Sequence, residues 1–328
     1  MTVLNSYDLN GKKLSFANWI SNLSPIDTPF CSMTPKESIK QTLFQWQVDS
    51  LVKAGKNAVP EGAESGDGAK LGSTTVKANV TQILRKVVKV SDTADVLANY
   101  GRGKELQYQM EKAAKELKRD LEWAFLNNEA QNPGSKSLPR KTAGYRNLIA
   151  PLSDADKDTG AVVNKALTTS VTEKDIFDMT CNLYIAGANA NVIMFHPSFG
   201  PFFSSLQEKT DTRKRIFENT PELSVYVSTI KDPLGQEFKL IPNRWMPAKT
   251  IYFFNPKDFT QMILRAPQRT QLAKDGSYEK WMIEMEAGLR IRNPFAAGML
   301  KTNAQIIAWD GTKGWNDKGF WNTDTAHE

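Results

Sequence analysis

A single long amphipathic helix is the strongest structural signal in the sequence. Residues 104–128 contain no glycine or proline and are rich in Glu, Lys, Leu, Ala and Gln, which lose little side-chain freedom in a helix. Glycines precede this stretch, and an Asn-, Pro- and Gly-containing segment ends it. At about 1.5 Å per residue, the helix would be about 37 Å long. Its apolar residues recur every three or four positions, which predicts one face packed on a sheet: Leu106, Met110, Ala113, Leu117, Leu121 and Ala124.

The rest of the helix predicts a wide charged face. Glu111 with Lys115, and Lys118 with Glu122, are pairs of opposite charge one turn apart. Periodicity alone indicates no more than a long amphipathic helix.

Two stretches of alternating polarity predict a long β-hairpin before this helix. Residues 42–51 and 74–91 alternate as strands with one covered face do, and Phe44 and Trp46 share the apolar side. Residues 55–72 between them are polar and glycine-rich, which predicts a mobile tip with no core of its own. Such a hairpin has too little cover to be stable alone, so we expect it to lie on another surface. A connection this long is usually functional or disordered.

The first 41 residues predict an arm rather than a packed unit. Lone apolar residues are spaced through polar and turn-forming sequence, a short helix is expected at residues 16–23, and three prolines hold the segment around Phe30 extended. Such a segment usually lies over a surface of its own chain or of a neighbouring copy. A loose N-terminal tail explains the pattern equally well.

A second unit is expected from about Thr172. The sequence predicts a helix with Thr172 and Asp175 in a capping box, a buried strand at 192–197 and a helix that starts at Pro197. Alternating helices and short strands are typical of an α/β unit. Further strands are expected at residues 223–230, 236–242, 249–255, 259–266 and 304–309.

A long late strand is expected at residues 278–292. Trp281, Ile283, Met285 and Ala287 would share one side of this strand, with Lys280, Glu284 and Glu286 on the others.

Composition excludes several classes of protein. The 328 residues suffice for two or three packed units. No apolar run reaches the roughly 18 residues of a membrane span, so we expect no membrane contact, and the N-terminus lacks the layout of a secretory signal. The two cysteines, Cys31 and Cys181, argue against a disulfide scaffold and for a reducing compartment. A net charge of +6 permits a face turned to nucleic acid without requiring one.

Candidate catalytic residues are few. Of the two histidines, His327 lies next to the C-terminus, and His196 follows a buried strand, where a capping or core role is expected. Asp175, Cys181 and His196 form the one polar centre that an enzyme could use, although a buried cysteine is usually inert. The sequence contains no metal-binding motif, and GRGKE at residues 101–105 lacks the first glycine and the Ser/Thr of a phosphate loop. We therefore expect no catalytic site, cofactor or metal.

Taken in order, the elements resemble those of a known protein family. The order is an arm, a glycine-tipped hairpin, a long helix, an α/β unit and a return strand, and it resembles the major capsid proteins of tailed bacteriophages with the Hong Kong 97-type fold, of a podovirus-like subfamily. The segments that carry the resemblance are TPF (28–30), LFQWQVDSL (43–51), KVSDTAD (89–95), ELKRDLEWAFL (116–126) and NP (293–294).

The resemblance implies an α+β fold with five regions. They are an N-terminal arm (1–41), an extended hairpin loop (42–91), a peripheral domain with the long helix as its spine (92–171), an axial domain (172–275), and return strands of the peripheral domain with a C-terminal tail (276–328).

The resemblance also implies a function and partners. Copies would assemble into pentamers and hexamers of an icosahedral head in the virion, put together in the host cytoplasm. Partners would be other copies, a scaffolding protein, a portal, possible decoration proteins, and packaged double-stranded DNA bound without base readout. The residues expected at contacts between copies are Trp19, Phe30, Trp46, Glu61, Glu64, Asp67, Lys70, Arg119, Glu122, Arg213 and Arg215. Two other classes stay open: a nucleic-acid-binding protein inside the virion, and an enzyme centred on residues 172–275.

Overall fold

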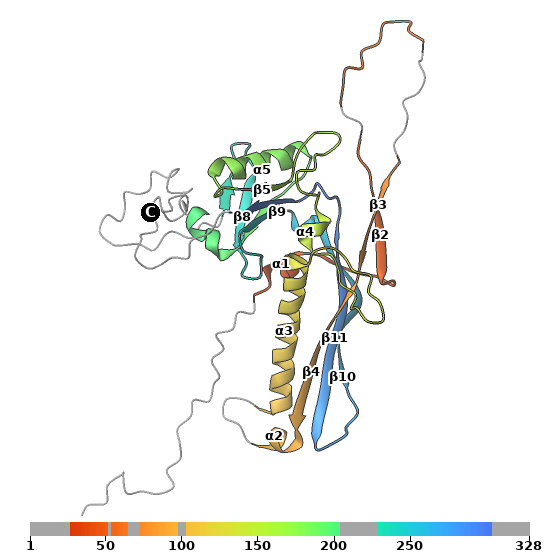
Figure 1. Ribbon diagram of the computed structural model, residues 1–328, viewed down its shortest axis with the longest axis vertical. Coiled ribbons are helices and arrows are strands. Elements are labelled where there is room, and N and C mark those ends of the chain that lie inside the picture. Colours follow the sequence, from red (N-terminus) through yellow and green to blue (C-terminus); the bar gives the residue numbers. More distant parts are fainter. Residues whose placement is uncertain (1–26, 52–53, 65–72, 98–102, 204–228, 304–328) are drawn as a thin grey trace, which may run out of the picture. The chain divides into compact units, whose positions relative to one another are not determined.

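The computed structural model describes residues 27–51, 54–64, 73–97, 103–203 and 229–303 and has an α+β architecture (Figure 1). Its helices are α1 (Pro29–Met33), α2 (Asp92–Val96), α3 (Glu105–Asn127), α4 (Tyr145–Leu148) and α5 (Glu173–Ile185), with 3-10 turns η2 (Pro197–Phe199) and η4 (Pro256–Asp258). Its strands are β1 (Lys36–Ser38), β2 (Leu43–Val48), β3 (Thr75–Val80), β4 (Gln82–Ser91), β5 (Asn164–Leu167), β6 (Val192–Phe195), β7 (Thr229–Lys231), β8 (Glu237–Pro242), β9 (Thr250–Phe254), β10 (Phe259–Gln271), β11 (Tyr278–Ile291) and β12 (Gly298–Thr302).

The strands form three sheets. A four-stranded sheet has the order β1-β10-β11-β4, a six-stranded sheet has the order β5-β12-β9-β6-β8-β7, and β2 pairs with β3 alone. The chain divides into two compact units. Within the described residues, unit 1 contains Arg85–Lys118 and Pro267–Glu284, and unit 2 contains Thr28–Leu84, Arg119–Ala266 and the chain from Met285.

The long helix forms as the sequence predicts. α3 spans Glu105–Asn127, within one residue of the expected bounds at each end. The predicted apolar face is confirmed: Leu106 is half-buried, and the other members of the stripe are buried, namely Met110, Ala113, Leu117, Leu121 and Ala124.

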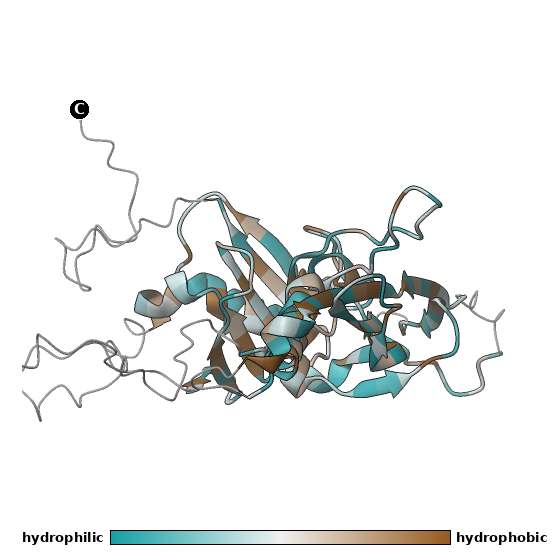
Figure 2. Ribbon diagram, turned by 90° about the horizontal axis from the view of Figure 1, so that it is seen from below, coloured by the Kyte–Doolittle hydropathy of each residue, from teal (hydrophilic) through white to brown (hydrophobic). Residues whose placement is uncertain are grey.

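In unit 1, the N-terminal part of α3 lies beside the part of β4 that begins at Arg85. Lys86 of β4 forms an ion pair with Glu116 of α3 at 3.9 Å, so even-numbered β4 residues face the helix. The odd-numbered residues Ile83, Val87 and Lys89 are exposed on the other face of the strand. More buried and exposed residues therefore alternate along β4, and Figure 2 shows the hydropathy of each residue on the elements.

In unit 2, the six-stranded sheet carries the main hydrophobic core. The predicted capping box is confirmed: the Thr172 hydroxyl accepts a hydrogen bond from the Asp175 N–H, and the Asp175 carboxylate accepts one from the Thr172 N–H. The buried face of α5 packs into a core with residues from β6, β8, β9 and β12. Its members include Ile176, Met179, Leu183, Ile193, Phe195, Phe238, Leu240, Ile251, Phe253 and Leu300.

The two large sheets divide the chain differently from the expected domain boundaries. β10, expected in the unit 172–275, belongs to the four-stranded sheet with β11. β5 and β12, expected with the flanking regions, belong to the six-stranded sheet, where β12 pairs with β5 in parallel and with β9 in antiparallel register. Sequence spacing could not give this result, because strand partners are chosen by contacts between distant segments.

The hairpin is confirmed, with one change. β2 and β3 pair antiparallel from Leu43 opposite Val80 to Val48 opposite Thr75. The single strand expected at residues 74–91 is instead two strands, β3 and β4, separated by Thr81 and belonging to different sheets.

Other strand predictions have mixed outcomes. The strands expected at 192–197, 236–242 and 249–255 are confirmed as β6, β8 and β9, and β10 and β11 include the strands expected at 259–266 and 278–292. The strand expected at 304–309, the short helix at 16–23 and most of the strand at 223–230 lie outside the described residues. None of the helices in the described part of the chain has the length and apolarity needed to span a membrane.

Candidate functional site: the hairpin and its base

The described outer part of the hairpin is exposed. Every described residue from 54 to 64 is exposed. Large apolar side chains on the hairpin are also exposed, among them Leu51 at 84%, Val59 at 76% and Val76 at 54%. Apolar groups on an arm without cover are typical of a surface that another molecule covers.

The base of the hairpin, in contrast, is packed against β11. Phe44 is buried and stacks on Trp46, with ring centroids 6.1 Å apart. A Cβ atom added to Gly288 of β11 would lie 2.7 Å from the Phe44 ring and 3.0 Å from the Val80 carbonyl oxygen. Glycine at position 288 therefore allows the hairpin base to approach β11 closely.

Asn79 fastens the same end of the hairpin by hydrogen bonds. Its side chain is fully buried, and its amide nitrogen donates to the Leu289 carbonyl at 2.6 Å and to the Thr142 hydroxyl at 3.1 Å. Its amide oxygen accepts from the Ala143 and Val80 N–H groups. One side chain thus joins β3 to β11 and to the loop after α3.

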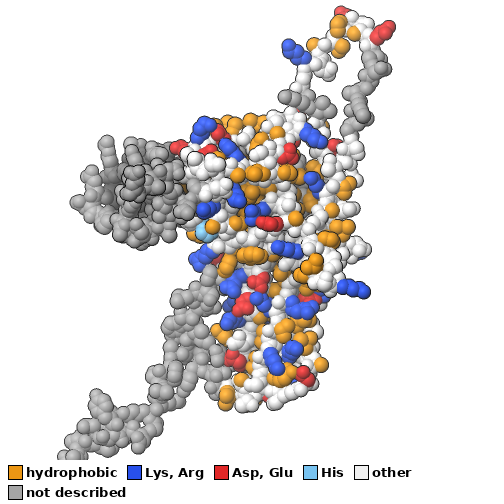
Figure 3. Space-filling model, viewed as in Figure 1, with side chains coloured by type: hydrophobic (Ala, Val, Ile, Leu, Met, Phe, Trp, Pro, Cys, Tyr) orange, Lys and Arg blue, Asp and Glu red, His pale blue; other side chains and the backbone are white. Residues whose placement is uncertain are grey.

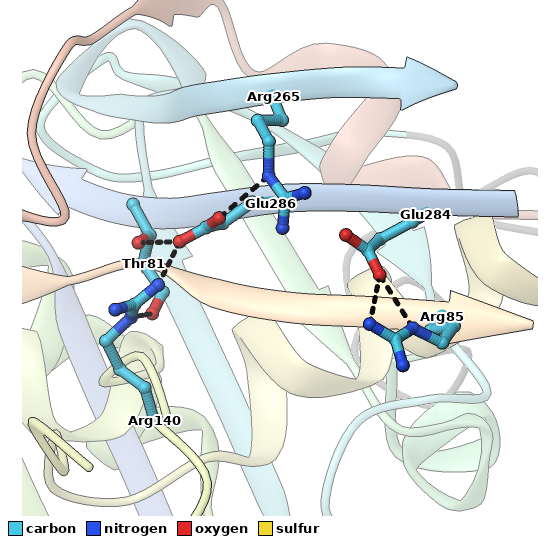
Figure 4. Close-up of polar contacts among 6 residues, drawn as sticks. All are labelled: Thr81, Arg85, Arg140, Arg265, Glu284 and Glu286. Carbon is cyan, nitrogen blue, oxygen red and sulfur yellow. Dashed lines mark hydrogen bonds and ion pairs between the residues drawn. The ribbon is translucent and has the colours of Figure 1, made fainter. Parts of the chain in front are cut away.

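A buried carboxylate lies beside the joint between β3 and β4 (Figure 4). Glu286 of β11 has a side chain that is only 4% exposed. Its Oε1 accepts hydrogen bonds from the Thr81 hydroxyl at 2.6 Å and from Arg140 Nη2, and its Oε2 accepts from Arg265 Nε at 3.0 Å. Two guanidinium groups and a hydroxyl therefore compensate the buried charge.

Glu284, two residues earlier on β11, is buried and forms a separate ion pair in unit 1 with the exposed Arg85. Arg85 of β4 donates to its Oε2 from Nε at 2.6 Å and from Nη2 at 2.5 Å (Figure 4). The sequence placed Glu284 and Glu286 on the side of the strand opposite Ile283 and Met285 but did not predict that both are buried and paired. The sequence did contain an indication of this arrangement: two glutamates at alternate positions in a strand rich in apolar residues suggest that arginines pair with them.

The N-terminal segment is anchored on α3 by another glutamate. Glu122 is fully buried, and its two carboxylate oxygens accept from the Phe30 N–H at 2.9 Å and the Cys31 N–H at 2.7 Å. Asn243 Nδ2 also donates to Glu122, at 2.7 Å. The expected surface pair of Lys118 with Glu122 is thus corrected: the Glu122 carboxylate points into the protein and holds the start of α1.

Phe30 lies at the centre of an aromatic cluster next to this anchor. It is fully buried and contacts rings from α3, α4, β9 and β10: Phe125, Tyr145, Phe254 and Phe259, at centroid distances from 5.5 to 6.5 Å. Burial raises the pKa of the Tyr145 hydroxyl well above its ordinary value, and that hydroxyl donates a hydrogen bond that helps join β9 to β12.

Burial corrects two of the expected contacts between copies. Phe30 and Glu122 have no accessible surface within their own chain, so they stabilise the subunit and are not available to a neighbouring copy. Trp46 is half-buried, Glu61 and Glu64 are exposed near the hairpin tip, and Arg119 is half-buried over the Trp245 ring. The remaining candidates lie outside the described residues: Trp19, Asp67, Lys70, Arg213 and Arg215.

Two of the three residues considered for catalysis have a structural role. The Asp175 carboxylate caps α5, and His196 caps η2 by accepting the Ser198 N–H at Nδ1. Partial burial lowers the pKa of His196, so its neutral form is favoured. Cys181 is half-buried on α5. Among the described residues, no group of three or more metal-ligating side chains occurs.

Surface charges give no strong indication of nucleic-acid binding. On the face shown in Figure 3, basic and acidic side chains are interspersed with hydrophobic ones. A dedicated binder usually gathers lysine and arginine into one patch.

The fold defines the class of protein. It is the Hong Kong 97-type fold of phage capsid proteins. The capsid of a native GTA particle matches with a TM-score of 0.62 at 14% identity, over 91% of this chain and 97% of that chain. The cyanophage A-1(L) capsid matches with a TM-score of 0.63 at 12% identity, over 90% of this chain and 98% of that chain.

Sequence comparison then shows the family. The family model of the SU10 major capsid protein matches residues 2–304. The major capsid protein of Escherichia phage Phieco32 is 52% identical over 348 residues, covering 94% of this chain and 99% of that protein. This chain belongs to the SU10 major capsid protein family, and the predicted resemblance to phage capsid proteins is confirmed.

Proposed function

We propose that the chain is the major capsid protein of a phage virion and that its copies assemble as pentamers and hexamers of the head. The observation that carries the proposal is the hairpin, whose base is fixed in unit 2 and whose outer part exposes Leu51, Val59 and Val76. A second copy would cover these side chains, and their burial would favour association. Family membership supports the same conclusion and does not favour a nucleic-acid-binding protein inside the virion.

Each region of the chain would have its own role in assembly. The hairpin of β2 and β3, residues 43–80, would reach a neighbouring subunit, and the arm would run along another. The exposed members of the predicted contact set, Glu61 and Glu64, would take part at the hairpin tip. The six-stranded sheet with α5 would form the ring-building domain, now including β5 and β12, and the four-stranded sheet with α3 would form the peripheral domain.

The finer parts of the proposal concern partners, place and chemistry. Scaffolding, portal and decoration proteins would bind the shell, assembly would occur in the host cytoplasm, and the chain would have no catalytic activity of its own. The shell would hold double-stranded DNA without base readout, supported by the net charge of +6. Binding to two unrelated duplexes of equal length should then be equally strong and weaken equally with salt. A preference for one duplex would contradict this part.

Electron microscopy tests the main proposal. The purified protein, alone or with a coexpressed scaffolding protein, should form shells, tubes or rings. A strictly monomeric particle at high concentration under both conditions would overturn it.

A further inference from the structure

The joint between the hairpin and the four-stranded sheet is a single residue with all its polar groups bonded. Thr81 follows the last residue of β3 and precedes the first residue of β4, and it is fully buried. Its N–H donates to the Thr42 carbonyl at 2.9 Å, and its carbonyl accepts from Arg140 Nε at 2.7 Å. Its hydroxyl donates to Glu286 at 2.6 Å. The backbone and side chain at the joint are therefore tied to three other segments.

Arg140 connects these ties into one network. Its Nε bonds the Thr81 carbonyl and its Nη2 bonds the Glu286 carboxylate, so one planar guanidinium fixes both groups relative to each other. Arg265 binds the other carboxylate oxygen. If the Glu286 carboxylate served only to join β11 to β10, its hydrogen bond with Arg265 would be sufficient. The additional bonds to Thr81 and Arg140 are directed at the joint.

The restraint stops a short distance along β3. Asn79 and Val80 are buried, Ala78 is half-buried, and Thr75, Val76 and Lys77 are exposed. Beyond Asn79, the hairpin is supported mainly by its own β2–β3 ladder. The direction of the hairpin is therefore set at its base. Hydrogen bonds to the buried Glu286 carboxylate have preferred angles and so restrict the orientation of the strand, whereas apolar contacts do not.

We infer that Thr81, Arg140 and Glu286 form a polar clamp that presets the direction of the hairpin in the free subunit. The inference rests on the proposed function, in which the hairpin contacts a neighbouring copy. A preset hairpin lowers the ordering cost of that contact, because the hairpin need not be oriented when subunits meet. The three residues are positioning residues: they act on the neighbour only through the hairpin.

The variant Thr81→Val tests the clamp with little change of shape. Valine keeps the branched side chain but removes the hydroxyl that reaches Glu286, and Glu286 keeps both arginines. Thr81→Ser restores the hydroxyl and is the matched rescue. Glu284→Gln is the control for loss of a buried glutamate charge on β11, because Glu284 pairs with Arg85 of β4. Arg140→Lys is a second test variant, which keeps the charge but loses the planar fork.

The hairpin direction is measured in the full-length, unassembled subunit by pulsed electron spin resonance. Nitroxide labels are placed at the exposed positions Ala58 and Lys136, both replaced by Cys, in a Cys181→Ser background. Cys31 is buried and should stay unlabelled. We expect Thr81→Val and Arg140→Lys to widen the distance distribution at least about twofold, as for a loosened hinge. Thr81→Ser and Glu284→Gln should keep the wild-type width.

Assembly yield, measured on the same variants without labels, separates the inference from the proposed function. We expect Thr81→Val to assemble several-fold less than Thr81→Ser. An unchanged distance distribution in both Thr81→Val and Arg140→Lys would overturn the clamp, whatever the yield. A widened distribution with wild-type yield would support the clamp and contradict the proposed role of the hairpin as a contact between subunits.

Discussion

Gly288 shows how one residue without a side chain lets two segments meet. The Phe44 ring and the Val80 carbonyl occupy the space that a Cβ atom at this position would need. We expect Gly288→Ala to lower the free energy of unfolding by about 1–3 kcal/mol, because an added methyl group overpacks the hairpin base. Urea unfolding of the unassembled subunit measures this.

A matched control is available at another glycine. A Cβ atom at Gly200 would meet no atom of the described residues within 4 Å, so Gly200→Ala should leave stability nearly unchanged. Combining Gly288→Ala with Phe44→Leu should cost less than the sum of the two changes, since the smaller side chain relieves the clash. Strict additivity would show that Phe44 is not what the new methyl group contacts.

His196 makes part of the stability depend on pH. Burial lowers the pKa of this imidazole below its ordinary value of about 6.5, and its Nδ1 accepts the Ser198 N–H only when neutral. Between the folded pKa and 6.5 the unfolded chain binds more protons, so stability rises with pH in that window. The contribution of His196 should therefore be complete above about pH 6.5 and be lost as the pH falls through that window.

The measurement is the urea midpoint at pH 8 and at pH 5.5. The wild type should lose more between these values than His196→Asn, because asparagine can cap the turn without titrating. Equal losses in the two proteins would contradict a titrating role for His196.

At the scale of elements, α3 is a scaffold for the N-terminal segment as well as a cover for a sheet. Glu122 accepts two backbone N–H groups of α1 and the Asn243 amide. We expect Glu122→Ala to destabilise the subunit by about 3 kcal/mol, because three buried donors lose their acceptor. The Phe30 and Cys31 amides should also lose protection in hydrogen exchange.

Glu116→Ala on the same helix is the control for this change. Glu116 pairs with Lys86 at 3.9 Å, and both side chains are partly exposed, so the cost should stay below about 1 kcal/mol. Equal effects of the two substitutions would mean that the α1 anchor contributes little.

At the scale of the whole molecule, we expect stability and assembly to depend on different parts of the chain. Most core residues lie in the sheets and helices, whereas the described tip residues are exposed. Deleting residues 57–70 should leave the unfolding transition of the subunit within about 1 kcal/mol, since shortening a loop changes closure entropy only slightly. The same deletion should strongly reduce shell formation in electron microscopy.

The variant Gly288→Ala is the control for the tip deletion. Gly288→Ala should affect both unfolding and assembly, whereas the tip deletion should affect assembly alone. A deleted protein that loses solubility as a subunit would show that the tip is part of the subunit core.

The sequence by itself determined the elements whose signals are local. The apolar stripe of α3, the capping box at Thr172 and the alternation around Phe44 each repeat with the period of the structure they form. The order of these elements along the chain also carried the resemblance to phage capsid proteins.

Tertiary structure alone decided which distant segments meet. It placed β5 and β12 in the six-stranded sheet, ended the hairpin at Thr81, and buried Glu122, Glu284 and Glu286. From sequence alone, a glutamate in a strand or helix is predicted to lie on the surface. Its arginine, hydroxyl or backbone donors come from distant parts of the chain and become visible only in the folded structure. The physical reason is that burying a charge is favourable only in the presence of such partners, and the partners are set by the fold rather than by sequence spacing.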